Sequence, residues 1–372
     1  MRDIIRDNVK NIPGWRTKRK LVAFVVDDYG CVRLASRAAR DRIEAARKVP
    51  ITQRFDRFDA LESREDLEML AEVLSAVRDS NGRGACFTPY VVTRNLDFEG
   101  TLAGGDEGIR LEGLSQTIAR AEQAGGSDYQ GLRAAWQEMV NSGHFRPQFH
   151  GSEHFNPALL SQSFSQNHPM LEVALENHSL ACLDKLPGLG RLGWTAAYDP
   201  DLSPPFLADI DRRLADGVAE FEAFFGQRPI AFAPPALGFP SDKELLVEDL
   251  GIQCIDLPFT QPSHSKLYFG VRLNWPGKRV GRTLRTVVRN AIFEPNSGRP
   301  GPVGLAMRQI QTAFRWSKPA IISSHRVNFG GVIDSENRDR GLGDLAELLK
   351  AIVARWPEVE FVGMDELLTC AT

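Results

Sequence analysis

Three short apolar segments of the chain are each followed by side chains that bind metals or move protons. LVAFVV (residues 21–26) precedes Asp27 and Asp28, FRPQF (145–149) precedes HGSEH with His150 and His154, and PAIISS (319–324) precedes His325. Adjacent carboxylates repel each other, and burying either one without a partner costs free energy or raises its pKa. A bound cation would offset that cost.

Two imidazoles and one carboxylate form a common ligand set for catalytic zinc, with one position left for water, and the same number of ligands serves non-haem iron. His150 and His154 are four residues apart, so on a helix they would share one face and could bind one ion. Successive strand side chains point to opposite faces, so one aspartate can bind the metal while the other accepts a proton. We expect one divalent metal, Zn²⁺ first, although Co²⁺, Fe²⁺ and Mn²⁺ accept such ligands.

The elements that must position these residues alternate between short apolar runs and helical periodicity, which is typical of an α/β fold with parallel strands. Strands are predicted over residues 21–26, 85–92, 147–150, 230–233, 252–257, 320–323 and 359–362. Ser63 and Asp66 predict a capping box at the start of a helix, and Gly226 predicts the end of a later one. In α/β barrels the catalytic residues gather where the strands end, which is where the aspartates and histidines lie.

No linker-like composition divides the chain, so we expect one barrel-like domain over residues 1–372. Residues 1–19 are predicted to be an N-terminal extension, and residues 95–129 and 156–191 to be insertions. The first insertion holds the glycine-rich GTLAGGDEG (100–108). Because no strand leads into it and no Lys-Ser or Lys-Thr follows, it is predicted to be a flexible surface loop rather than a phosphate loop.

Composition excludes several functional classes. The chain has 372 residues and a net charge of −3, which argues against a nucleic-acid-binding protein. No apolar run approaches the roughly 18 residues that span a bilayer, and the N-terminus lacks the apolar centre of a signal peptide. The five cysteines are scattered and suit neither a zinc finger nor a disulfide framework. These features predict a cytoplasmic protein whose cysteines are reduced; they do not define its oligomeric state.

Taken together, the blocks above resemble the polysaccharide deacetylase family, whose members share the NodB-homology domain. The family pattern is an Asp-Asp-Gly block, a His-x-x-x-His block, an Arg-Pro-Pro block and a late histidine. This chain has VVDDYG, HGSEH, APPALG and SSHRVNF in that order. GACFTPYVV is similar to the family's second strand, and SGHFRPQFHG to its approach to the histidine block. The resemblance covers most of the chain outside the insertions and implies a distorted barrel of about seven strands and helices.

The resemblance also implies a role for each matching residue. Asp28, His150 and His154 would bind the divalent metal, Asp27 would be the general base for the metal-bound water, and His325 would protonate the leaving amine. The implied activity is that of a hydrolase that removes N-acetyl groups from an amino sugar or polysaccharide.

Further residues are candidates for contacts with the reacting group. The resemblance implies that the backbone N–H of Ala236, after the double proline, helps to hold the oxyanion. Arg326 and Asn328 flank His325 in the chain and are candidates for contacting the substrate.

Two departures from the family pattern concern charged groups. The arginine of the third block is Ala233 here, so another cation such as Arg326 must pair with the base to keep its pKa low. The acid that orients the late histidine in the family has Asp256 as its only candidate.

Three other functions remain open. The same site could hydrolyse another non-peptide C–N bond, as in a cyclic amide or ureide, so the expected partner is a carbohydrate or a small amide. Asp27 and Glu153 could instead form the acid pair of a metal-independent glycoside hydrolase. Finally, the loss of the arginine is compatible with a catalytically inactive carbohydrate-binding homologue.

Overall fold

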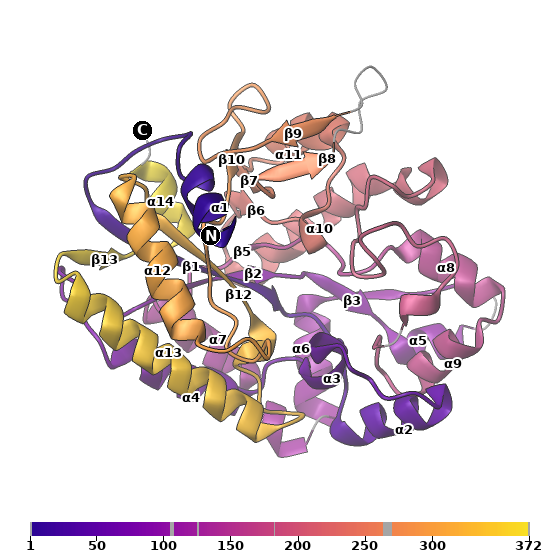
Figure 1. Ribbon diagram of the computed structural model, residues 1–372. Coiled ribbons are helices and arrows are strands. Elements are labelled where there is room, and N and C mark those ends of the chain that lie inside the picture. The colour runs from indigo at the N-terminus through magenta and orange to yellow at the C-terminus, as the bar shows by residue number, and fades with distance from the viewer. Residues whose placement is uncertain (1, 105–107, 125, 182, 263–269, 371–372) are drawn as a thin grey trace.

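One curled sheet lies at the centre of the molecule (Figure 1), and it consists of nine parallel strands. The computed structural model describes residues 2–104, 108–124, 126–181, 183–262 and 270–370. The strands of this sheet are β1 (Lys20–Tyr29), β2 (Phe87–Val91), β5 (Gln148–Phe149), β6 (Ala231–Phe232), β7 (Cys254–Asp256), β10 (Arg285–Val287), β11 (Ala291–Ile292), β12 (Ala320–His325) and β13 (Val359–Phe361). Their order is β10-β7-β6-β5-β2-β1-β12-β11, and β13 pairs with the beginning of β1. Within the described residues β10 and β11 do not pair, so the barrel is incomplete.

Strand β1 lies between β2 and β12 inside this sheet and is buried on both faces. Val22, Phe24 and Val26 pack into the main hydrophobic core, whereas the alternate residues of the strand face a second apolar cluster. A strand that is covered on both faces needs the continuous apolar run seen here. The parallel register with β12 places Asp27 directly opposite His325. Two segments almost 300 residues apart in the chain therefore end side by side.

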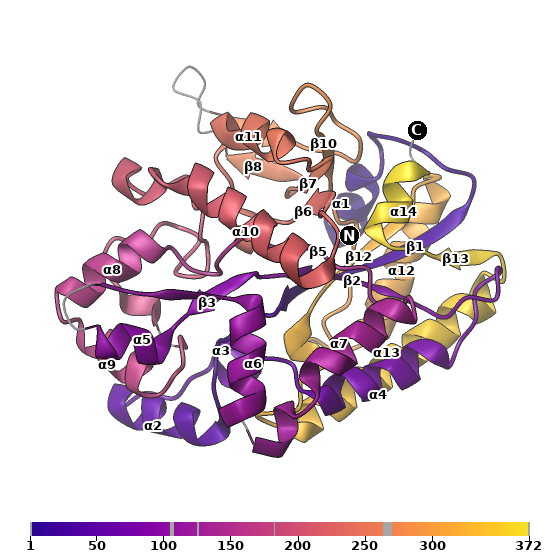
Figure 2. The ribbon, with the colours of Figure 1, turned by 180° about the vertical axis from the view of Figure 1, so that it is seen from behind.

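Helices cover the outside of the sheet (Figures 1 and 2). They are α1 (Arg2–Lys10), α2 (Arg37–Arg47), α3 (Arg54–Phe58), α4 (Arg64–Ser75), α5 (Phe98–Ala103), α6 (Leu114–Ala124), α7 (Leu132–Asn141), α8 (Pro157–Ser165), α9 (Pro169–Glu176), α10 (Ile210–Phe225), α11 (Glu244–Asp249), α12 (Pro302–Arg315), α13 (Ser335–Arg355) and α14 (Met364–Thr369). The predicted capping box of Ser63 and Asp66 starts α4, and Gly226 ends α10 with a left-handed backbone, φ 70°. Helices α7, α4, α13 and α12 pack in a row.

The predicted fold class, an α/β fold with an incomplete barrel, is confirmed. All seven predicted strands are present, with ends that differ by a few residues, and the sheet gains β10 and β11, which the sequence did not predict. The predicted flexible loop at 100–108 is wrong in its first part, because residues 100–103 belong to α5. Asp97 accepts a hydrogen bond from the backbone N–H of Gly100 at the start of that helix. Residues 105–107 lie outside the described part of the chain.

The two predicted insertions contain regular structure. The first holds α5, α6 and a short antiparallel hairpin of β3 (Arg94–Leu96) and β4 (Leu111–Gly113), and the second holds α8 and α9. Another hairpin, β8 (Thr260–Pro262) with β9 (Val271–Leu273), follows β7. Across the described ranges, no helix is long and apolar enough to cross a membrane.

Candidate metal and catalytic site

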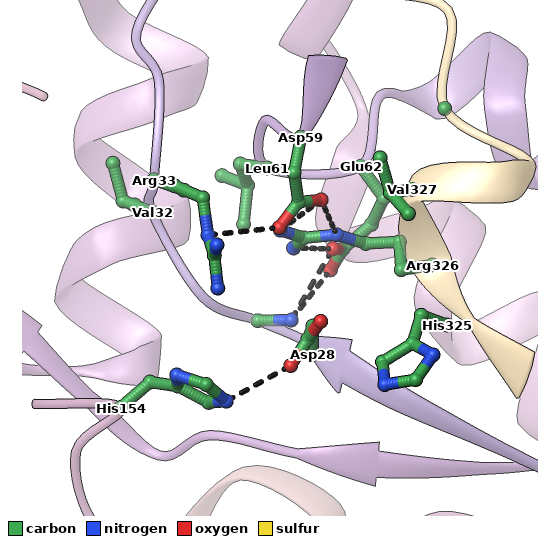
Figure 3. Close-up of polar contacts among 12 residues, drawn as sticks. Asp28, Val32, Arg33, Asp59, Leu61, Glu62, His154, His325, Arg326 and Val327 are labelled. Carbon is green, nitrogen blue, oxygen red and sulfur yellow. Dashed lines mark hydrogen bonds and ion pairs between the residues drawn. The ribbon is translucent and has the colours of Figure 1, made fainter. Parts of the chain in front are cut away.

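All three predicted metal ligands meet at the carboxyl ends of β1 and β5. Asp28, His150 and His154 are buried, and one ligand atom from each lies within 4.8 Å of the others. The Oδ1 atom of Asp28 is 2.9 Å from Nε2 of His154 and 3.5 Å from Nε2 of His150. Figure 3 shows the Asp28–His154 contact, with His325 on the other side of Asp28.

The local backbone differs from a regular strand and helix at these positions. Asp28 has φ 76° at the irregular end of β1, which turns its side chain relative to that of Asp27. Residues 150–156 form no helix, so the predicted helical face for the two histidines is wrong, and an irregular turn between β5 and α8 brings them together. Gly151 has φ 101° in that turn, and a Cβ there would lie 3.0 Å from the Tyr198 ring. The turn therefore requires glycine at this position.

The donor set fits a divalent cation. His150 Nδ1 lies 2.7 Å from the Ala233 carbonyl oxygen and so donates to it, which leaves the buried Nε2 without a hydrogen-bond partner. Burial lowers the pKa of His154 and so favours its neutral, metal-binding form. Burial alone would raise the pKa of Asp28, but the neighbouring imidazoles hold it well below its usual value. Two neutral imidazoles and one ionised carboxylate are the ligand forms that Zn²⁺ requires.

The proposed base, Asp27, is held by an arginine that the sequence analysis did not identify. Arg289 donates from Nη1 to Oδ2 of Asp27 at 2.6 Å and from Nη2 to Oδ1 at 2.8 Å, while its Nε donates to Asp256 at 2.6 Å. Burial would raise the pKa of Asp27, but Arg289 keeps it below its usual value. The suggestion that Arg326 supplies this cation is therefore wrong, and Arg289 supplies it.

The proposed acid, His325, is oriented by Glu294. Its Nδ1 lies 2.6 Å from Oε1 of Glu294, and its Nε2 is 3.7 Å from Oδ2 of Asp27. Glu294 is fixed in turn by Arg54 at 2.6 Å and by the side-chain amide of Asn328 at 2.7 Å. Burial would lower the pKa of His325, but Glu294 outweighs it and raises the pKa to about 9. The suggested orienting acid, Asp256, is instead bound to Arg289.

Arg326 and Asn328 lie behind the site. Arg326 is 1% exposed and donates to Asp59 at 2.9 Å and to Glu62 at 2.7 Å (Figure 3). Glu62 also accepts hydrogen bonds from Trp136 and from the backbone N–H of Gly30, two residues after Asp28. This network joins the turn after β1 to the end of β12. Neither Arg326 nor Asn328 lines the cavity in front of the metal ligands.

That cavity has a volume of about 310 Å³ and is lined by the three metal ligands, Asp27, Arg289, His325 and six further residues. Among these six, Ala236 and Leu237 both have φ 54°. No described residue accepts a hydrogen bond from the Ala236 N–H, so this donor has no partner within the described part of the chain. The remaining four are Arg33, Phe55, Thr195 and Ser323.

Glu153, the second acid of the glycoside hydrolase alternative, is not part of the cavity wall. It is fully buried, and its carboxylate accepts hydrogen bonds from Arg213 at 3.0 Å and Ser152 at 2.8 Å. A carboxylate held in this way does not face a bond that Asp27 could attack. The acid pair proposed for a glycosidase is therefore wrong.

The residues that the sequence analysis missed follow the two strands that it missed. Arg289 comes after β10 in RTVVRN, and Glu294 comes after β11 in AIFE. Strands of two or three residues give too short an apolar run to be distinguished from a loop. The available signal was the position of a charged residue directly after each run, as with Asp27 and His325.

No family model matches the sequence, and no curated protein matches it either. Similar solved structures include an allantoinase, Puue (9% identity, TM-score 0.49, 96% of this chain and 93% of that one), and a probable polysaccharide deacetylase from Pseudomonas aeruginosa PAO1 (8%, 0.48, 95% and 91%). A third is a 4-alpha-glucanotransferase from Thermococcus litoralis (9%, 0.47, 94% of this chain and 40% of that one). At sequence identities of 8–9%, these similarities concern the fold alone and not the activity.

Proposed function

We propose that the protein is a metal-dependent hydrolase that removes N-acetyl groups from an amino sugar or polysaccharide. The observation that carries this proposal is that a buried set of two histidines and one aspartate shares a single cavity with Asp27 and His325. Asp28, His150 and His154 would hold the ion, for which we expect Zn²⁺. When bound, such an ion acts as a Lewis acid toward water and an acyl carbonyl.

Asp27 would accept the proton of the attacking water. A general base must be ionised at the working pH, and the paired Arg289 keeps the pKa of the buried Asp27 low enough for this. Arg289 also fixes the direction of the carboxylate, because both of its oxygens are bound. The base is therefore oriented before a substrate arrives.

His325 would protonate the leaving nitrogen. Its pKa is raised to about 9 beside Glu294, so its imidazolium form is available near neutral pH. The Ala236 N–H, on the cavity wall, would donate to the oxygen that becomes negative when the carbonyl is attacked. Together these groups supply a base, an acid and an oxyanion donor around one space.

The size of the cavity favours a small substrate. A space of about 310 Å³ accommodates one acetamido group with part of a sugar ring, or a small ring compound, so only the reacting unit of a polymer would enter it. For this reason hydrolysis of a cyclic amide or ureide is the second candidate function. The third possibility, a catalytically inactive homologue, is less well supported, because Arg289 supplies the cation that is missing at position 233.

The test is hydrolysis by purified protein reloaded with Zn²⁺, using N-acetylglucosamine, its oligomers, and cyclic amides and ureides. Acetate release supports the first function, and a ring-opened product without acetate supports the second. Asp27→Asn should retain the metal and lose turnover, whereas the exposed Asp41→Asn should behave as wild type. Full turnover by Asp27→Asn would exclude Asp27 as the base, and no turnover of any substrate by the metal-loaded protein would favour the inactive homologue.

A further inference from the structure

Arg33 is a charged residue of the cavity wall that the proposed mechanism does not use. It follows β1, is 5% exposed, and lines the same cavity as the metal ligands. In Figure 3 its guanidinium extends toward the side of the site where Asp28 and His154 lie. Its position next to the reacting groups suggests contact with whatever occupies the cavity.

The ion pairs of Arg33 leave one edge of its guanidinium available. Its Nη1 donates to Asp56 at 3.2 Å, and its Nε is 3.5 Å from Asp59. No described residue accepts a hydrogen bond from Nη2. Arg289 differs in this respect, because both of its Nη atoms and its Nε are bound to Asp27 and Asp256. Of the two arginines on the cavity wall, only Arg33 has a guanidinium edge whose N–H groups can bind a ligand.

Two aromatic rings hold this guanidinium in place. Its central carbon lies 5.3 Å from the centre of the Phe55 ring and 5.1 Å from that of Trp194. Such cation–π contacts, together with the two aspartates, restrict the rotation of the side chain. An arginine that is fixed in advance loses little entropy when it binds a ligand.

The other polar groups of the wall suit the same kind of ligand. Apart from Asp27 and Asp28, whose roles are assigned above, the wall offers the Ala236 N–H and the hydroxyls of Thr195 and Ser323. These groups can all donate hydrogen bonds. A pocket rich in donors recognises a ligand rich in acceptor oxygens, and an arginine among them favours one that is negatively charged.

We propose that Arg33 binds a carboxylate of the substrate, so that the natural substrate is a small N-acyl compound with an acidic group close to the acylated nitrogen. This proposal rests on the proposed function for the identity of the acyl group, but not for the anion site itself. Arg33 is then a specificity-determining residue, and neutral amino sugars are poor analogues of the true substrate.

Two matched pairs of probes test this. They are N-acetylglucosamine with N-acetylglucosaminuronic acid, and N-acetylglycinamide with N-acetylglycine. In each pair the second compound carries a carboxylate that the first lacks. Binding to the Zn²⁺-loaded protein is followed by saturation-transfer NMR, and the acetate methyl signal in the same tube reports hydrolysis. In wild type we expect the acidic member of at least one pair to bind about tenfold more tightly, as one charge-assisted hydrogen bond provides.

Variants then assign the preference to Arg33. Arg33→Gln should abolish it, Arg33→Lys should keep part of it, and Arg212→Gln, at an exposed arginine, should keep all of it. Equal binding within both pairs by wild type, or a full preference in Arg33→Gln, would overturn the proposal. The comparison of acidic and neutral probes on the wild-type protein tests the proposal even if a variant does not fold. Anion preference without acetate release would overturn the deacetylase proposal alone, and acetate release without anion preference would overturn the Arg33 site alone.

Discussion

Arg289 donates hydrogen bonds to both carboxylate oxygens of Asp27, although the two residues are 262 positions apart in the chain. The arginine follows β10 at one edge of the sheet, and the aspartate lies near the end of the interior strand β1. Arg289 lies between β10 and β11, the two edge strands of the sheet, and its ion pair with Asp27 leaves the base charged, buried and fixed in direction by one partner.

Removing this partner should change the pH dependence of the reaction. Burial alone raises the pKa of Asp27, and Arg289 reverses that effect. In Arg289→Gln the base would therefore ionise only at higher pH, and the acidic limb of kcat/KM should move upward by about 1–3 pH units. The measurement is a pH–rate profile, with the exposed Arg285→Gln as the control. An unchanged acidic limb would show that Asp27 is not the titrating base.

The alkaline limb of the pH–rate profile should depend on Glu294. The carboxylate raises the pKa of His325 to about 9, so the imidazolium is present below that pH and is lost as the pH rises through it. Glu294→Gln removes the charge that stabilises the imidazolium, so the alkaline limb should move to lower pH. Glu358→Gln, at an exposed residue, is the matched control. If the alkaline limb of the Glu294→Gln profile does not move, the group that titrates in that limb is not His325.

Metal content should depend on the two site histidines and not on others. Wild type reloaded with Zn²⁺ is expected to hold about one ion per chain, and His150→Ala and His154→Ala should lose most of it because three ligands become two. His168→Ala, a histidine outside the site, should retain it. Elemental analysis after dialysis gives the stoichiometry without any assay of activity. Equal zinc in all four proteins would place the ion elsewhere.

The buried network behind the site should contribute strongly to stability. Arg326→Met leaves Asp59 and Glu62 without their shared cation, and breaking a buried ion pair from one side costs about 3–5 kcal/mol. Urea denaturation should show this loss in the free energy of unfolding. Glu68→Ala breaks an exposed pair with Arg64 and should change it little. A small effect in Arg326→Met would show that this ion-pair network contributes little to the free energy of unfolding.

The sequence predicted the parts of the site that follow long apolar runs. Asp28 and His325 follow runs of about six residues, so their strands could be recognised and their convergence inferred from the fold. Arg289 and Glu294 follow strands too short to recognise, so the partners of the base and the acid were assigned to the wrong residues. Arg33 and Arg54 lie in or before irregular segments, whose path depends on tertiary packing rather than on local pattern.

The predicted helical face for His150 and His154 failed for a related reason. The spacing of four residues is compatible with a helix, but Gly151 allows a backbone that no helix has, with φ 101°. Glycine in such a segment predicts a turn as readily as the histidine spacing predicts a helix. The ligands were therefore identified correctly while the element that carries them was not.

Seven non-glycine residues in the described ranges have positive φ, and three of them, Asp28, Ala236 and Leu237, line the one cavity. Each such residue costs the folded chain on the order of 1 kcal/mol, which substitution by glycine would relieve. Asp28 and Ala236 would supply a metal ligand and an N–H donor to the proposed site, so the strained backbone of this fold is concentrated where the proposed chemistry needs unusual directions of side chains and N–H groups.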